Sequence, residues 1–372
     1  MARLRLRQFD SIRQLRDAAA AWDRLWLRSE VSLPTARAEL VAQWLEHFAP
    51  RARWRALVVE DGQEPVAALP LVGRRVRGLL PAGDLTSNYW SPNGELLLDP
   101  AADAEAVLDL LAAALEPLPW PLLWLDLVPY EKPYWQALIG ALHRRGLATE
   151  VRLHYRIGQV EINGDFEDYR AGWPKNHRRN VRKDSQRLER AGAVELKLYS
   201  EFTPDEVDRR LRRAFQIEDS SWKNGAGRPV FRTPGMFEFY RRQARQLAEW
   251  GSLRLAFLEH QGEPIAFELG WTAKEVYHSF KVSYKESYRQ YGPGHLLRLH
   301  LIRSLHGRPG PGLVDFQGPL SEALACWSTR SYPIGRLVVA PRRLAGRALL
   351  AGYRTVVPMI RRFRAAGTGA RD

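Results

Sequence analysis

Two segments about 200 residues apart share one hairpin pattern, and this internal repeat constrains the fold more than any other feature. Residues 55–72 read RALVVEDGQEPVAALPLV, and residues 254–271 read RLAFLEHQGEPIAFELGW. Each segment has an apolar run, a polar turn with Gly, Glu and Pro, and a second apolar run, which is typical of a β-hairpin. The turn glycines, Gly62 and Gly262, are 200 residues apart. The sequence therefore predicts a structural unit that occurs twice.

The order of elements around the two hairpins is also alike. Helical patterns precede each hairpin, and a loop, an apolar helix and a short strand follow it. The helical segments are 13–28 with 38–48, and 204–218 with 236–250; the late strands are 122–127 and 312–316. We therefore predict two tandem α/β domains, each a mixed sheet flanked by helices, over residues 1–160 and 161–340. A basic amphipathic helix or tail would follow over 341–372.

The excess of positive charge over negative charge lies almost entirely in two stretches of the chain. The 372 residues carry a formal charge of +14, but 170–190 hold eight basic residues and two acids, and 341–372 hold eight Arg and one Asp. This distribution argues against a body coated with charge for non-specific nucleic-acid binding. The first stretch predicts a helix from Pro174 to Gly192 with Val181 and Leu188 as its apolar stripe. It is either a solvated face or a surface for an anionic substrate, a phosphate or a membrane.

The second basic stretch has the pattern of an amphipathic helix. Its apolar residues fall on one side at 100° per residue, arginines gather on the other, and Pro358 would kink it. The apolar residues are Leu349, Tyr353, Val356, Val357, Ile360 and Phe363. Residues 341–364 therefore suit a membrane interface or an acidic partner, with packing against the body of the chain as the alternative.

Composition excludes several classes of protein. Cys326 is the single cysteine, so an intrachain disulfide and a cysteine-ligated metal cluster are ruled out, and the histidines lack metal-ligand spacing. The most apolar stretch, 107–128, contains three acids and three prolines, unlike a membrane span. The N-terminus has no apolar run of the kind found in signal peptides. We expect a cytoplasmic protein without a metal, with peripheral attachment to the inner face of the membrane as an option.

One loop in the second half has the pattern of an anion-binding turn. The strand 276–284 leads through KESYRQYGPGH into the apolar helix LLRLHLIRSL. A helix N-terminus presents unpaired N–H groups and a positive dipole end, and glycines permit close approach of a pyrophosphate. The first half has more strand at this point, so one cofactor site is predicted; a plain turn is the alternative. The expected cofactor-binding residues are Val282, Arg289, Tyr291, Gly292, Gly294, His295 and Leu296.

Four segments together resemble a known family. They are KNHRRNVRKDSQRLERAG (175–192), EDSSWKNGAG (218–227), YGPGHLL (291–297) and DFQGPLSEALACW (315–327). In this order they resemble the GNAT superfamily in its tandem, Fem-related form, and more closely the CelD/BioF-type acetyltransferases. The resemblance implies transfer of an acyl group from acyl-CoA, acetyl-CoA first of all, to an amine or hydroxyl of a small molecule or a cell-envelope or polysaccharide precursor. Direct attack by the acceptor would need a general base and an oxyanion donor.

The chain departs from that family at three places. Gly292 stands where the family usually has Ser, and Ala323 and Leu324 stand where it often has Tyr-Lys. Lys285 replaces the Asp that commonly follows the tyrosine. A backbone cradle should tolerate Gly292, whereas the other two departures concern the choice of acceptor or catalysis itself.

Several side chains are candidates for the chemistry. Glu268 lies inside the apolar strand IAFELGW, where a carboxylate needs a partner or a role, and it is the first candidate for general base. Asp315 ends a buried-looking strand, and His278 and Tyr284 alternate onto one face of theirs, where either could relay a proton. The catalytic candidates are Glu268, Asp315 and Tyr284, and the substrate-binding candidates are Trp222, Lys223 and His278. Salt bridging, capping, core packing and a surface loop are the corresponding structural alternatives.

Two other functions remain open at this point. Fem-type relatives take an aminoacyl group from tRNA, and the helix 175–190 would then follow phosphates with a steep salt dependence. A non-catalytic accessory module, held at a membrane by the C-terminal helix, is the third reading.

Overall fold

In the computed structural model, the described residues are 4–76, 78–221, 229–307 and 309–355. They form two compact units, of which unit 1 comprises Met1–Val31, Thr35–Tyr155 and Pro333–Asp372, and unit 2 comprises Ser32–Pro34 and Arg156–Tyr332. The division differs from the expected boundaries at 160 and 340. Residues 333–340 join unit 1 because β15 (Arg330–Ala340) pairs with β8 (Leu123–Val128) of that unit.

Unit 1 has a sheet in the order β1-β2-β3-β4-β8-β15, in which only the β4–β8 pair is parallel. Its further strands are β1 (Leu4–Phe9), β2 (Trp54–Asp61), β3 (Glu64–Val76), β4 (Leu80–Leu85), β5 (Ser87–Asn88), β6 (Ser91–Pro92) and β7 (Leu97–Leu98). Its helices are α1 (Ile12–Asp17), α2 (Ala19–Arg28), η1 (Pro34–Ala36), α3 (Ala38–Phe48), α4 (Ala104–Leu115) and α5 (Pro133–Arg144). The predicted helices 13–28 and 38–48 are thereby confirmed, with a break near Ala18.

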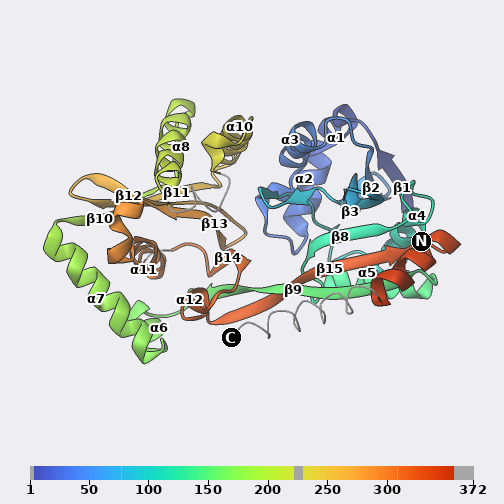
Figure 1. Cartoon of the computed structure of the whole chain (residues 1–372). Helices are drawn as coiled ribbons and strands as arrows, with labels where there is room; N and C mark the ends of the chain where they lie inside the picture. The colour runs from blue at the N-terminus through green and yellow to red at the C-terminus, as the bar shows by residue number, and fades with distance from the viewer. Residues whose placement is uncertain (1–3, 77, 222–228, 308, 356–372) are drawn as a thin grey trace. The chain divides into compact units, whose positions relative to one another are not determined.

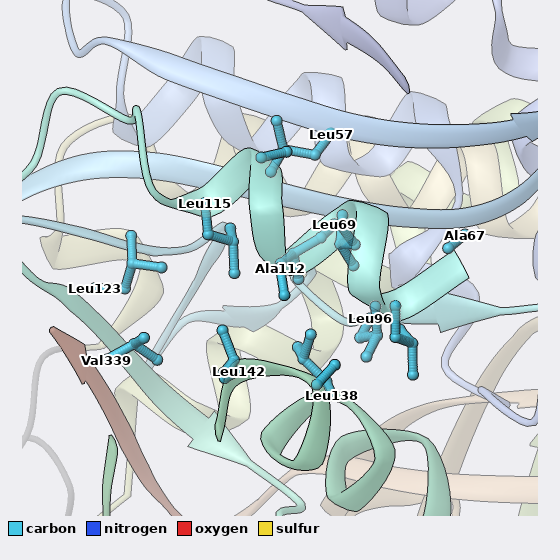
Figure 2. Close-up of a cluster of buried hydrophobic side chains, with 14 of the residues drawn as sticks. Leu57, Ala67, Leu69, Leu96, Ala112, Leu115, Leu123, Leu138, Leu142 and Val339 are labelled. Atoms are coloured by element: carbon cyan, nitrogen blue, oxygen red, sulfur yellow. The ribbon is translucent and has the colours of Figure 1, made fainter. Parts of the chain in front are cut away.

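A large apolar core holds unit 1 together, and Figure 2 shows part of it. Leucines of α4 and α5 fill the space between these helices and the inner face of the sheet. Leu57 and Leu69 come from β2 and β3, Leu115 from α4 and Leu142 from α5, and all four are fully buried. Such burial stabilises the unit by roughly 1.5–3 kcal/mol per leucine.

Unit 2 has a mixed sheet in the order β9-β14-β13-β12-β11-β10, in which β13 and β14 are parallel. Its strands are β9 (Ala148–Glu161), which begins in unit 1, β10 (Val194–Tyr199), β11 (Leu253–His260), β12 (Glu263–Ala273), β13 (Val276–Tyr284) and β14 (Leu313–Pro319). Its helices are α6 (Phe166–Ala171), α7 (Lys175–Ala191), α8 (Pro204–Asp219), η2 (Val230–Arg232), α10 (Met236–Glu249), η3 (Glu286–Tyr291), α11 (Pro293–His306) and α12 (Glu322–Ala325). Helices α8 and α10 cover one face of the sheet, and α11 with α7 covers the other (Figure 1).

The two hairpins are confirmed, down to their irregularities. Strands β2 and β3 have a bulge between Val59 and Glu60, and β11 and β12 have one between Leu258 and Glu259. The pairs Glu60–Pro65 and Glu259–Pro264 show that equivalent residues are 199 apart, not the 200 that separates the turn glycines. Gly62 is the first of the two turn residues in its hairpin, and Gly262 is the second in the other hairpin. Gln261, which precedes Gly262 in the turn, also adopts a positive φ.

The two basic stretches have different surroundings. Helix α7 covers the predicted span, with Val181 and Leu188 buried as expected. Residues 344–355 are helical, and Leu350 and Tyr353 pack on Trp124 of unit 1. The described part of the C-terminal helix therefore packs against the body, while Val356, Val357, Ile360 and Phe363 lie outside the described residues. No helix in the described ranges is long and apolar enough to cross a membrane.

This docking predicts a loss of stability on truncating Tyr353. Its ring lies 4.8 Å from the Trp124 ring and under the Arg152 guanidinium, which is 4.1 Å away. We expect Tyr353→Ala to lower the free energy of unfolding by about 2 kcal/mol or more. Leu344→Ala serves as the control, because Leu344 is 87% exposed. Urea unfolding measures both, and equal values for the two variants would show that the helix does not pack as described.

Candidate active site in the second unit

Strands β13 and β14 pair over three residues and then separate. The paired residues are Val276 with Leu313, Tyr277 with Val314, and His278 with Asp315. On its other side β14 pairs with β9, from Leu313 with Glu161 to Pro319 with Ile157, and beyond Asp315 it no longer pairs with β13. Within the described residues no strand pairs with the β14-facing edge of β13 beyond His278. The two strands therefore form a fork, with His278 and Asp315 at its base.

A hydrogen-bonded network of buried side chains holds Asp315 at this fork. Its Oδ2 accepts from Gln159 Nε2 at 2.7 Å, and its Oδ1 accepts from Gln317 Nε2 at 2.7 Å and from the Gln317 backbone N–H at 3.0 Å. Arg330 Nε in turn donates to Gln159 Oε1 at 2.9 Å. Gln317 adopts φ +52°, a conformation that costs energy for a side chain other than glycine. The carboxylate is thus fixed in one orientation by neutral donors.

His278 belongs to the same network and is fully hydrogen-bonded as a neutral ring. Gln317 Nε2 donates to its Nδ1 at 3.0 Å, so Nε2 carries the proton and donates to the Ser32 carbonyl at 3.2 Å. Burial lowers the pKa of His278 to about 4, against a smaller opposite effect of Asp315. The ring therefore stays neutral near pH 7 and orients Gln317.

This buried histidine predicts a pH-dependent stability. Between pH 6.5 and 4 the unfolded chain protonates His278 and the native state does not, so the free energy of unfolding falls as the pH is lowered. The loss from this residue is about 3 kcal/mol over that window. We expect His278→Gln to flatten the slope relative to the wild type in urea unfolding at both pH values. Identical slopes would mean that His278 titrates normally in the folded protein.

The α11 N-terminus begins in a glycine turn next to the end of β13. Gly292 adopts φ +59°, and a Cβ there would meet Asp184 Oδ2 at 2.8 Å, so this position requires glycine. No side chain caps the helix. The N–H groups of His295 and Leu296 donate to the Gly292 carbonyl, whereas that of Gly294 has no acceptor in the described part of the chain. The turn thus offers an anion one open N–H and the helix dipole.

The equivalent helix of unit 1 is closed to such a ligand. Asp103 caps α4, and its carboxylate accepts from the Ala106 N–H at 3.2 Å. Trp120 packs against β4, where a Cβ on Gly83 would meet its ring at 2.4 Å. A negative cap and a filled space make an anion site unfavourable at this end of unit 1.

Glu268 lies under α11, away from the Asp315 network. It pairs with Val282 across the sheet, about 13 Å along β13 from His278. Burial raises the pKa of Glu268, opposed by Arg298 and by the Tyr277 and Ser279 hydroxyls. The Oε1 of Glu268, the Tyr277 hydroxyl and the Arg298 Nε are buried, and none forms a geometrically good hydrogen bond with a described residue.

A cluster of aromatic and histidine rings lies beside Arg298. His295 stacks on Trp327 with ring centroids 6.1 Å apart, and Trp173 and His177 each lie 4.7 Å from the Trp327 ring. The His177 pKa is lowered to about 4, first by burial and then by His295 and Arg298. One ring nitrogen of each of these four residues is buried without a hydrogen-bond partner in the described residues. These orphaned groups leave room for ordered water or a polar ligand beneath α11.

The candidate residues fall into separate groups. His278 and Asp315 meet at the fork, whereas Glu268 and Tyr284 belong to the α11 side of the sheet. The expectation that His278 and Tyr284 share a face is wrong, because a bulge shifts the register of β12 against β13 between Leu269 and Gly270. His278 therefore faces Trp271 on the α10 side of the sheet.

The expected cofactor-binding residues lie around the glycine turn, but not all of their side chains are available to contact a ligand. Leu296 is buried in the core, and Val282, Tyr284 and Tyr291 pack partly against it. Arg289 is exposed and paired with Glu286 at 3.3 Å. Trp222 and Lys223 lie outside the described residues. In the described ranges no group of three His, Cys, Asp or Glu side chains is placed to hold a metal ion.

Sequence reasoning missed the residues that orient the site. Gln159 comes from β9, far from Asp315 in the sequence, whereas Gln317 lies two residues after Asp315 in β14. A glutamine carries no local signal for a buried network. Arg298 could have been noticed, because it is a cation within the apolar run of α11. His177 lies among the basic residues of α7, and its position there gives no sign that its ring is partly buried.

Unit 2 thus has a mixed sheet whose parallel central strands part beside a glycine turn and a helix. Residues 175–320 match the family model described as Acetyltransferase (GNAT) domain. This segment therefore carries a GNAT domain, which includes the fork, the glycine turn and α11. No curated protein matches the chain significantly.

Solved structures share the fold over nearly the whole chain. FemX has a TM-score of 0.57 at 10% identity, over 89% of this chain and 96% of its own. A conserved protein of unknown function from Bacteroides thetaiotaomicron VPI-5482 has a TM-score of 0.54 at 12% identity, over 92% of this chain and 100% of its own. L-PGS from Bacillus licheniformis has 0.52 at 12% identity, over 92% and 96%. The predicted fold of two GNAT-like units is confirmed.

Proposed function

We propose that this GNAT-fold chain is an acyltransferase that moves an acyl group from acyl-CoA, acetyl-CoA first of all, to an amine or hydroxyl. The observation that carries the proposal is the fork of β13 and β14 beside the glycine turn of α11. An acyl-CoA has an anionic pyrophosphate at one end, two amides in its pantetheine arm and a thioester at the other. The turn, the open β13 edge and the base of the fork offer partners for these groups in that order.

The donor's pyrophosphate would lie at the α11 N-terminus, where the Gly294 N–H and the helix dipole favour negative charge. The amides of the pantetheine arm would bond to the open edge of β13, as an added strand would. This arrangement directs the thioester toward His278 and Asp315. Tyr284 lies beside Gly294, so it would flank the donor.

In the proposed reaction, Asp315 removes a proton from the acceptor, whose nitrogen or oxygen attacks the thioester carbonyl. The tetrahedral intermediate collapses, the C–S bond breaks and CoA leaves as a thiolate that takes up a proton. Gln159 and Gln317 hold the Asp315 carboxylate in position for this step. Glu268 is the second candidate for general base, from beneath α11.

The acceptor is a small amine or a saccharide, and a cell-envelope or polysaccharide amino sugar is the class proposed. Support comes from the resemblance of the sequence to CelD/BioF-type acetyltransferases. Residues 341–364 are proposed as a further contact with an acidic partner or membrane; in the described part of this range, Arg343 and Arg347 are exposed.

A thiol-release assay tests the proposal. The purified chain is incubated with acetyl-CoA and a panel of amino sugars and small amines, and free CoA is followed with a thiol reagent. We expect acceptor-dependent release with at least one member of the panel. Binding of acetyl-CoA without release for any acceptor would restrict the role of the chain to ligand binding.

Aminoacyl-tRNA is the second candidate donor, and the exposed cations along α7 favour it. Lys183 and Arg190 are exposed, and Arg187 reaches the Gln290 carbonyl at 3.0 Å, next to the glycine turn. Such a donor would add many phosphate contacts, so activity would fall steeply with salt. A mild salt response would favour acyl-CoA.

A further inference from the structure

A groove rich in arginine lies between α6, α7 and the C-terminal half of α11. Its volume is about 590 Å³, within the range of sites for small ligands. Its charged lining consists of the basic side chains Arg170, Lys175, Arg178, Arg179, Arg182 and Arg303 and one carboxylate, Glu189. The basic groove, as we name it, is therefore a concentrated positive site in a part of unit 2 that the proposed reaction does not use.

The periodicity of α7 places these cations together. Residues 175, 178, 179, 182, 185, 186 and 189 recur at helical spacing and lie on one face of this helix. Val181 contributes from the apolar stripe, and Leu299 and Trp173 supply the apolar wall. The first two turns of this helix face thus supply four cations to the lining, at positions 175, 178, 179 and 182.

Five of the six cations have no anionic partner among the described residues, and Arg170 is the exception. Arg170 pairs with Glu167, Arg178 donates to the Ala171 carbonyl, and Arg303 lies over the Phe166 ring. Lys175, Arg179 and Arg182 form no ion pair with any described residue, and all three are exposed. Glu189 already accepts a hydrogen bond from Ser185 at 2.7 Å. The net charge of the groove is therefore uncompensated within the described part of the chain.

The basic groove is separate from the glycine turn. Asp184 and Arg187 contact the 290–292 segment, and they lie on α7 more than 100° around the axis from the groove-lining face. Leu299 and Arg303 follow Gly292 by about 10 and 16 Å along α11. The body of α7 thus lies between the two places, and a donor on the turn leaves the groove open.

We propose that the basic groove binds an oligophosphate ligand of about mononucleotide size, as a site distinct from the acyl donor. The arginine guanidinium groups and the Lys175 ammonium could bind several closely spaced phosphate oxygens at once, whereas a ligand with a single carboxylate would engage only one or two of these cations. A membrane surface fits less well, because the apolar residues of α7 are buried and its exposed side offers none for insertion. A long RNA fits less well, because three helices line a pocket of small volume and not an open track.

Calorimetric titration of the full chain with tripolyphosphate and with ADP tests this site. Wild-type protein should bind tripolyphosphate with one-to-one stoichiometry. The double variant Arg179→Glu/Arg182→Glu should weaken binding by about tenfold or more. The matched control is Lys183→Glu/Arg190→Glu, which makes the same charge change on the same helix at two exposed positions that do not line the groove. The control should change the affinity less than threefold.

Acetyl-CoA is then titrated into four samples: wild-type protein, the groove variant, the control variant, and wild-type protein saturated with tripolyphosphate. Equal acetyl-CoA affinities throughout support a separate site. The proposal would be overturned if millimolar tripolyphosphate gave no heat, if both double variants lost tripolyphosphate affinity equally, or if tripolyphosphate competed with acetyl-CoA. Binding of single-stranded RNA or anionic vesicles by a protein that does not bind tripolyphosphate would also overturn it. Circular dichroism confirms that both variants fold.

Discussion

Asp315→Ala should reduce turnover by about 10² to 10⁴-fold while leaving acetyl-CoA affinity unchanged. The reason is its place at the base of the fork, where donors from Gln159 and Gln317 fix the direction of the carboxylate. Rates come from the thiol-release assay at saturating acceptor, and donor affinity comes from calorimetry. An effect on turnover alone would separate a chemical role from a role in donor binding.

The control for Asp315 is Glu322→Ala, because Glu322 is an exposed acid seven residues further along the chain. It should retain full activity. Asp315→Ala also removes the acceptor of the Gln159 amide and one of the two acceptors of the Gln317 amide, which costs about 1–3 kcal/mol, so the melting temperature is measured in parallel. A folded Asp315→Ala variant with wild-type turnover would exclude Asp315 as the base and direct attention to Glu268.

Gly294→Glu should abolish donor binding, with at least about a hundredfold loss of acetyl-CoA affinity. The new carboxylate would stand at the α11 N-terminus, where it would occupy the space near the open N–H and repel a pyrophosphate. A carboxylate is tolerated at a helix N-terminus, so the variant should fold. Titration calorimetry with acetyl-CoA measures the loss.

Gly294→Ala separates the charge from the loss of glycine. A Cβ at this position would lie 3.6 Å from Tyr284 Cδ1, an ordinary van der Waals contact, so we expect folding and donor affinity to be kept. If Gly294→Glu binds acetyl-CoA as well as Gly294→Ala does, the donor does not use this turn. Gly292 is unsuitable for the same experiment, because its positive φ and its contact with Asp184 make any side chain disruptive.

Local pattern was enough to predict most of the fold. The hairpins, the flanking helices and the span of α7 follow from alternation, helical spacing and turn residues, which act over a few neighbours. The end of unit 2 did not follow, because β15 returns to unit 1 through a pairing with β8 about 200 residues earlier in the chain. The turn of the C-terminal helix toward Trp124 is likewise a long-range contact.

The candidate site was predictable only in part. The glycine turn and Asp315 have local signals, a Pro-Gly step before a helix and an acid at a strand end. The sequence pattern predicted the wrong face for His278, because one extra residue at a bulge reverses the alternation of side chains beyond it. Gln159 meets Asp315, and Gln317 meets His278, only because β9, β14 and β13 come together at the fork, and this convergence has no counterpart in the order of residues.

The central claim is that unit 2 binds an acyl-CoA donor along β13 and the glycine turn. The most direct test is isothermal titration of the wild-type chain with acetyl-CoA and with a longer acyl-CoA. One-to-one binding of at least one of them, absent from Gly294→Glu, is the predicted result. No binding of either thioester by the folded protein would contradict the claim, and aminoacyl-tRNA would then be the donor to test.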